Sequence, residues 1–219
     1  IQNVSFLNRM LGGSATIPGG TSARGTVAFV KDTYSTKSTL TTGKGSVSIN
    51  GSYDTGKGKY SATLDAQQFP LSKILTGSSM HDLTAQLDIK GHGFDIFSKS
   101  TEMRANAQIS KFGISDYDLS NLNLNATLRR GRGNISFNSG NVFLDGGGEI
   151  TTQLGKDGMS ATAKTLINRI DMRKFTGKED TLFIATRISA KAWANSDMTA
   201  YRIGADLDDT KITAKNSTY

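Results

Sequence analysis

The sequence predicts an all-β protein built from antiparallel strands. Apolar and polar side chains alternate over many stretches, and turns rich in Gly, Asn and Asp separate these stretches. Apolar residues make up only 36% of the 219 residues, which is too few for a thick core covered on both sides. The connections are too short for the crossovers that parallel strands require. We therefore expect about ten to thirteen short antiparallel strands.

Residues 45–66, "GSVSINGSYDTGKGKYSATLDA", show the pattern most clearly. Val47 and Ile49 fall on one face of the first expected strand, and Ser46 and Ser48 fall on the other. A Gly-Lys-Gly turn then leads into a second alternating stretch. The segment is thus predicted to be a hairpin with one apolar face.

The same alternation returns further along the chain, at residues 83–89, 103–109, 122–128, 182–192 and 201–207. The Gly-rich stretches "RRGRGN" and "DGGG" are expected to be turns, because glycine adopts the positive φ that tight turns need. Two segments break the alternation and end on Gly, which predicts short helical turns or loops at residues 69–77 and 170–177.

The expected organisation is an N-terminal short helix with a linker (1–23), followed by one repetitive β-domain (24–219). Ser-Ala-Thr recurs 99 positions apart, at residues 61–63 and 160–162, each time after a Gly/Lys turn. This recurrence predicts two degenerate repeats within the domain, roughly 24–115 and 116–219.

The sequence offers little for catalysis or for cofactors. There is no cysteine, and His81 and His92 have no partner at a metal-ligand spacing. We expect no enzyme activity, no metal and no cofactor. The net charge is +7, but the basic residues are scattered except for Arg129, Arg130 and Arg132. We interpret these arginines as solvated surface and expect no nucleic-acid partner.

No apolar run approaches the roughly 18 residues of a membrane helix. We expect a soluble domain of a longer protein, with any anchor outside the sequence given. The inward positions of the alternating stretches are often Ala, Gly or Thr. Such a sheet can curl and leave a trough for an acyl chain, although an ordinary filled core fits the same pattern.

Residues 117–151, "YDLSNLNLNATLRRGRGNISFNSGNVFLDGGGEIT", and the segment "FPLSKIL" after the first hairpin resemble the repeated units of the AsmA-like superfamily. The resemblance is greatest to its TamB branch, the translocation and assembly module of Gram-negative bacteria. It implies an elongated, curled antiparallel sheet that forms a hydrophobic groove, shaped like a taco. It also implies a periplasmic segment of a protein anchored in the inner membrane.

The function implied by the resemblance is phospholipid transport between the inner and outer membranes. Assistance to outer-membrane protein assembly, with a TamA-type barrel as partner, is the other implied role. The resemblance transfers no catalytic residue. It implies only a set of groove-facing residues that would contact lipid acyl chains: Val47, Ile49, Tyr53, Tyr60, Leu64, Leu83, Leu87, Ile89, Ile109, Leu122, Leu124, Leu128, Ile135, Phe137, Leu144, Ile150 and Leu154.

Other functions fit parts of the pattern. A closed-core structural or adhesive β-domain of the cell envelope is the main alternative, and in it these residues would pack against one another. An outer-membrane barrel needs strands of about 9–11 residues with aromatic girdles, and most of the stretches here look shorter. A carbohydrate-active β-helix would need clustered carboxylates.

Overall fold

The computed structural model describes residues 18–75, 79–115, 117–172, 182–197, 199–214 and 217–218. Within them nearly all regular structure is β-strand, and α2 (Leu71–Ile74) is the one helix. The strands form a large antiparallel sheet that does not close on itself. The predicted all-β, antiparallel fold is therefore confirmed, as is a short helical turn within 69–77. The helix expected near the N-terminus and most of the turn expected at 170–177 lie outside the described residues.

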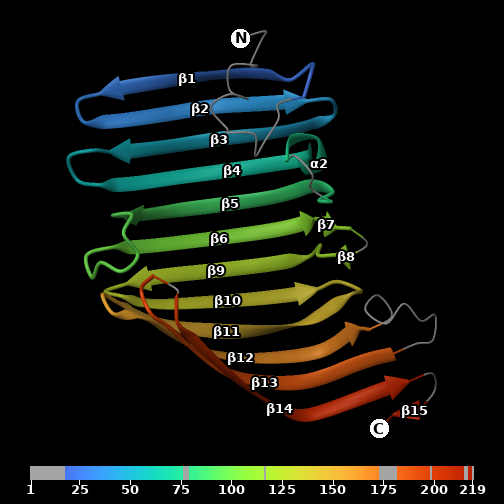
Figure 1. The fold of residues 1–219 in the computed structure, drawn as a ribbon. Coiled ribbons are helices and arrows are strands. Elements are labelled where there is room, and N and C mark those ends of the chain that lie inside the picture. The colour runs from blue at the N-terminus through green and yellow to red at the C-terminus, as the bar shows by residue number, and fades with distance from the viewer. Residues whose placement is uncertain are drawn as a thin grey trace. The chain divides into compact units, whose positions relative to one another are not determined.

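The chain forms two compact units, residues 1–90 with 107–120 and residues 91–106 with 121–219. In the first unit the main strands follow one another in chain order (Figure 1). They are β1 (Ser22–Val30), β2 (Thr33–Thr42), β3 (Gly45–Asp54), β4 (Lys59–Pro70) and β5 (Asp82–His92), whose last two residues belong to the second unit.

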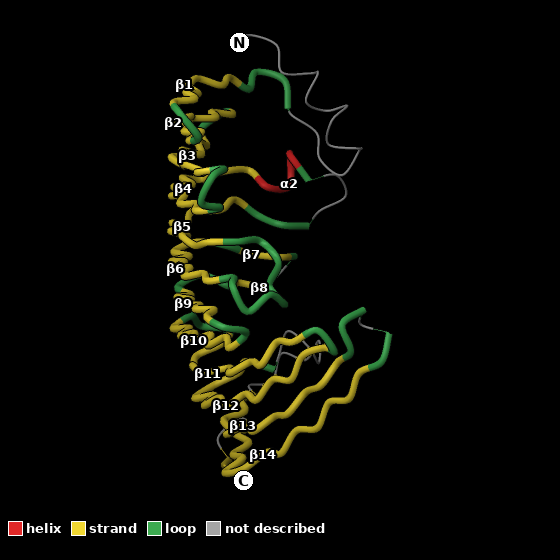
Figure 2. Tube along the Cα trace, turned by 90° about the vertical axis from the view of Figure 1, so that its left-hand side faces the viewer, coloured by secondary structure: helices red, strands yellow, loops and turns green. Residues whose placement is uncertain are grey.

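Two small elements accompany these strands. The short strands β7 (Gly113–Ile114) and β8 (Tyr117–Asp118) pair with each other. In Figure 2, α2 and the β7–β8 pair lie on the same side of the first unit's strands. That side is therefore partly covered, while no described element lies on the other side of β1 to β4.

The second unit also keeps chain order. Its strands are β9 (Leu122–Arg129), β10 (Arg132–Gly140), β11 (Leu144–Gly155), β12 (Gly158–Asp171), β13 (Leu182–Ala194), β14 (Tyr201–Ala214) and β15 (Ser217–Thr218), while β6 (Glu102–Lys111) has residues in both units. The β12–β13 and β13–β14 registers each shift once. Such irregularities increase local twist, and Figure 2 shows β11 to β14 turned away from the direction of β9.

Positive-φ residues close the hairpins where the sequence predicted turns. Gly58 (φ 63°) ends the Gly-Lys-Gly turn between β3 and β4. Arg130 (φ 53°) and Gly131 (φ 73°) form the turn between β9 and β10. Two successive left-handed residues are the signature of the type I′ hairpin turn, whose twist matches that of the flanking strands.

The turn predicted at "DGGG" is wrong, because Asp145–Gly148 lie inside β11. A Cβ atom on Gly146 would lie 2.6 Å from the carbonyl oxygen of Leu166, and one on Gly148 would lie 2.6 Å from that of Lys164. These glycines therefore allow β12 to approach β11 closely. Glycine is needed here because it has no side chain, and not because it can adopt a positive φ.

The strands are also longer than the sequence indicated. β12 and β14 have 14 residues each and β13 has 13. The alternation is interrupted by glycines in β11 and by the register shift after Ile167 in β12, so long strands look like short ones in the sequence.

The packed core is small. Among the described residues only six hydrophobic side chains are buried, and no large side chain is fully buried. Val47, Ala66 and Phe69 form one cluster, against which Leu71 and Ile74 of the α2 segment pack. Most apolar side chains of the sheet are thus only half-buried or exposed.

Candidate functional site

One face of the first unit has no charged side chain over β1 to β4. The register pairs Leu40 with Val47, and Val47 with Ala66, so these three side chains project to the same side. The charged residues of the same strands all alternate to the opposite side: Arg24, Lys37, Asp54, Lys59 and Asp65. We call the first side the uncharged face and the second the polar face.

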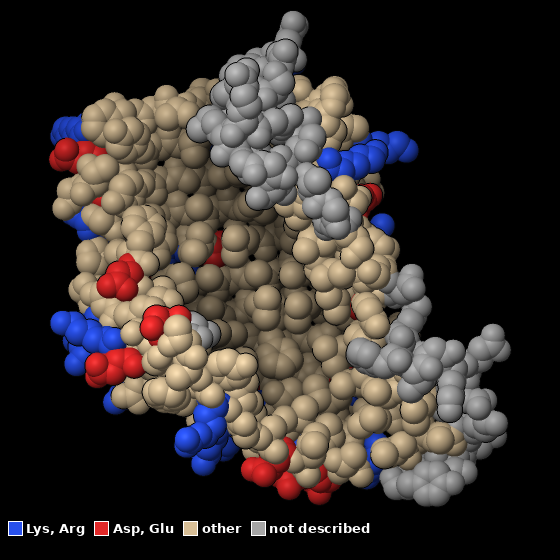
Figure 3. All heavy atoms as spheres, in the orientation of Figure 1, with Lys and Arg blue, Asp and Glu red and all other residues tan. Residues whose placement is uncertain are grey.

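The second unit shows the same separation over β9 to β14. Leu124 faces Phe137, Ile135 faces Ile150, and the row continues through the small residues of β12 and β13. Its charged side chains lie on the polar face, for example Glu149 opposite Lys164 and Arg187 opposite Asp208. Figure 3 shows Lys, Arg, Asp and Glu side chains mainly around the margins of the face in view.

The structure brings the predicted groove residues onto the uncharged face of their own unit. Within the first unit, the register places there Val47, Ile49, Tyr53, Tyr60 and Leu64. Leu83 packs against the cluster of Val47, so Leu83, Leu87 and Ile89, which alternate along β5, lie on the same side, and Ile109 is a half-buried position of the alternating strand β6. Within the second unit, the register places there Leu122, Leu124, Leu128, Ile135, Phe137, Leu144, Ile150 and Leu154. Their placement follows from period-two geometry alone.

The uncharged face is covered in some places and open in others. The Phe69–Ile74 segment packs over Val47 and Ala66. Val27 is 76% exposed on β1, and Ile203 and Leu207 on β14 are 70% and 64% exposed. On β14, Ile203 and Leu207 lie on the same face of one strand, and exposed apolar side chains grouped in this way are characteristic of an interaction site.

Sequence reasoning missed several members of this face. Val27 and Phe29 lie on it, but β1 has apolar residues on both sides and so shows no alternation. Ile188 and Ile203 belong to the alternating stretches 182–192 and 201–207, yet they were not included among the predicted groove residues. The signal was present for the β13 and β14 residues and absent for β1.

Neutral hydrogen bonds join neighbouring strands on the polar face of the first unit. The hydroxyls of Thr39 and Ser48 lie 3.1 Å apart, and those of Ser52 and Ser61 lie 3.0 Å apart, across neighbouring strands. Such cross-strand pairs fix the register without burying apolar surface. This face therefore presents a hydrated exterior.

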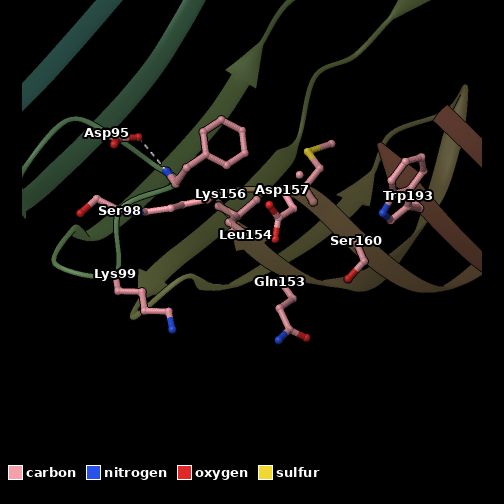
Figure 4. A pocket seen from close by; sticks show the side chains of 13 residues that line it. Asp95, Ser98, Lys99, Gln153, Leu154, Lys156, Asp157, Ser160 and Trp193 are labelled. Atoms are coloured by element: carbon pink, nitrogen blue, oxygen red, sulfur yellow. Dashed lines mark hydrogen bonds between the residues drawn. The ribbon is translucent and has the colours of Figure 1, made fainter. Parts of the chain in front are cut away.

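A pocket of about 850 Å³ lies in the second unit, where the β11–β12 turn meets residues 95–99 (Figure 4). Figure 4 shows Asp95, Ser98 and Lys99 on one side and Trp193 on the other. The backbone N–H of Phe97 donates to Asp95 Oδ1 at 3.0 Å, which shapes the loop. Only the fold brings this loop to the turn, so no pattern in the sequence predicts the pocket.

No constellation for metal chemistry is found in the part of the chain that the structure describes. No three His, Asp or Glu side chains in it are grouped to hold a metal ion. Among the same residues no helix has the length and hydropathy needed to cross a membrane. Comparison with known protein families, curated proteins and solved structures gave no match.

Proposed function

We propose that the uncharged face binds lipid acyl chains, with the sheet curled into an elongated hydrophobic groove. The observation that carries the proposal is the absence of charge on this face throughout β1 to β4 and β9 to β14, within each unit. A core-facing surface would also be uncharged, but here large side chains such as Val27 and Ile203 are left exposed.

The energetics favour an acyl chain as the occupant. Each methylene transferred from water onto an apolar surface gains about 0.8 kcal/mol, so several in contact give useful affinity without any polar contact. A single charged side chain in the row would oppose this gain through its desolvation cost. An uninterrupted uncharged row therefore suits a sliding, weakly specific hydrocarbon better than it suits a folded protein partner.

This function agrees with the resemblance to the TamB branch of the AsmA-like superfamily. In that setting the chain would be a periplasmic part of an inner-membrane-anchored protein, carrying phospholipid between the two membranes. A role in outer-membrane protein assembly with a TamA-type barrel would use strand edges. β14 pairs with β15 only at Thr213 and Ala214, so the rest of its outer edge offers backbone groups for strand addition.

The alternative, a structural or adhesive domain with a closed core, predicts mutual packing of the same residues. The few buried side chains and the open sheet weigh against it. The two functions separate in a lipid-binding experiment, since a closed core leaves no surface for hydrocarbon.

The test is native mass spectrometry with lipid extraction on protein purified from a Gram-negative host without detergent. The variant Leu87→Arg with Leu124→Arg places charge on the uncharged face of each unit. The control Gln86→Arg with Asn125→Arg places the same charge on the polar face of the same two strands. Phospholipid retained by the wild type and the control but lost by the first variant supports the proposal. Lipid absent from the wild type, or equal in both variants, contradicts it.

A second pair keeps the test valid if the first variant fails to fold. Ile203→Arg changes an exposed side chain on the uncharged face of β14, where folding tolerates charge. Gly204→Arg is its neighbour on the polar face, with no heavy atom within 4 Å of the added Cβ. We expect only the change at residue 203 to reduce uptake of a fluorescent phosphatidylethanolamine.

A further inference from the structure

Four basic side chains line one depression in the second unit. Arg129, Arg130 and Arg132 come from the β9–β10 hairpin, and Lys99 comes from the loop before β6. The depression has a volume of about 750 Å³. The sequence showed the arginines as a cluster at a turn, and the fold adds the lysine from 30 positions upstream.

The hairpin holds two of these charges in an unfavourable arrangement. Arg129 and Arg132 are direct cross-strand partners, so both side chains project to the polar face from adjacent positions. Like charges in directly opposite positions of an antiparallel pair destabilise the hairpin. An anion between them would remove this repulsion.

The residue type at the first turn position is not the one that this backbone conformation favours. Arg130 has a φ of 53°, a conformation that favours Asn, Asp or Gly over a residue with a long side chain. The left-handed backbone fixes the direction in which the arginine leaves the turn.

Nearby carboxylates do not neutralise the cluster. Glu102 accepts a hydrogen bond from Nε of Arg129 at 3.2 Å, and both side chains are largely exposed. Within the described part of the chain no ion pair is found for Arg130, Arg132 or Lys99. These three cations therefore line the depression without a carboxylate partner among the described residues.

We propose that this depression binds a phosphate group. Planar guanidinium groups donate two parallel hydrogen bonds to phosphate oxygens, and an ammonium group adds a point charge. Thr127 and Asn134, on the same face and also lining the depression, supply neutral donors. The site is distinct from the uncharged face, since its hairpin side chains lie on the polar face, and it does not depend on acyl-chain binding.

The phosphate has two possible sources, a soluble phosphate ester or a phospholipid headgroup. Isothermal titration with inorganic phosphate and with glycerol 3-phosphate probes the first. Flotation with vesicles of phosphatidylglycerol, compared with phosphatidylcholine vesicles, probes the second. Binding of the soluble compounds identifies a site for free phosphate, and binding of the anionic vesicles alone identifies a headgroup site.

The variant Arg130→Gln with Arg132→Gln tests the site in both arms. The control Lys191→Gln with Arg202→Gln removes the same charge from the polar face of the same unit. We expect the first variant to weaken binding about tenfold or more and the control to leave it within about twofold. Equal losses of affinity in the two variants would show that only the net charge of the protein matters, which contradicts a defined site. The absence of binding by the wild type in both arms would also overturn the proposal.

Lys99→Gln provides an independent readout. It changes a loop residue and leaves the hairpin intact, so a folding defect in the arginine variant does not affect it. We expect it to weaken the same binding several-fold. An unchanged affinity in this variant would remove the loop from the site and contradict the four-cation arrangement.

Discussion

Phe29 and Tyr34 face each other across the β1–β2 hairpin, with ring centroids 4.4 Å apart and an interplanar angle of 33°. The two side chains are 57% and 48% exposed, so the contact lies on the open part of the uncharged face. The pair combines two roles. It holds the end of the hairpin together, and under the proposed function it would present aromatic surface to an acyl chain.

Because both rings remain partly hydrated, we expect their mutual contribution to be modest. A double-mutant cycle with Phe29→Ala and Tyr34→Ala should give a coupling free energy of about 0.5–1.5 kcal/mol in urea unfolding. A coupling close to zero would show that the contact is not maintained in solution.

The side chain of Phe69 has the opposite character, since it is buried at 8% exposure in the cluster with Val47 and Ala66. We expect Phe69→Ala to lower the free energy of unfolding by about 3 kcal/mol, because a cavity forms beneath the α2 segment. Phe29→Ala is the matched control and should cost well under half as much. Equal losses would contradict the position of the core.

Gly148 tests the close approach of β11 and β12. A Cβ atom there would lie 2.6 Å from the carbonyl oxygen of Lys164 and 2.9 Å from the Cα of Thr165, so backbone must move. We expect Gly148→Ala to destabilise the protein by about 1–3 kcal/mol. Gly204→Ala, with no neighbour within 4 Å, should be neutral or stabilising by up to about 1 kcal/mol in the same thermal unfolding assay.

The turn between β13 and β14 contains one carboxyl with a shifted pKa. Thr199 donates its hydroxyl to Oδ1 of Asp197 at 2.8 Å and its backbone N–H to the same atom at 3.3 Å. These two hydrogen bonds, the hydroxyl first, hold the pKa of Asp197 below its ordinary value. The charged form therefore stabilises the turn at pH values above that ordinary value, and this stabilisation is lost as the pH falls through the lowered pKa.

Thr199→Val removes the hydroxyl donor and should raise the pKa of Asp197 toward its ordinary value. Thr199→Ser keeps the donor and should leave the pKa lowered. An NMR titration of the Asp197 carboxyl carbon measures both. A pKa that does not change in the valine variant would assign the shift to the backbone donor instead.

Most of the fold was predictable because successive side chains of a strand point to opposite faces of the sheet. A sheet with one apolar and one polar face therefore produces an alternating sequence. The hairpin of residues 45–66 was expected, and the register pairs Ile49 with Leu64 and Tyr53 with Tyr60. The same geometry fixed which side chains share a face. It could not show whether a second layer covers that face, since a covered and an open apolar row have the same pattern.

The failures have local causes. The stretch "DGGG" was predicted to be a turn because glycine can adopt a positive φ. In the structure Gly146 and Gly148 lie within a strand, where a side chain would collide with the neighbouring strand. The pocket beside Trp193 is lined in part by residues 95–99, and the depression at Arg130 is lined in part by Lys99. These loop residues lie far away in sequence from the hairpins that they meet. A periodic pattern describes neighbouring residues, so it cannot predict contacts between residues that are distant in the sequence.

The main strands of each unit follow one another in the sheet in the order in which they occur in the chain. From β9 to β14 each strand hydrogen-bonds to the next strand along the chain, so the contact order of this region is low. Each new hairpin can therefore pair with the preceding strand as the polypeptide is synthesised. Duplication of one hairpin would lengthen the sheet by about 9.5 Å and leave every existing pairing intact. The length of the sheet can therefore change by whole hairpins without disturbing the pairs already formed.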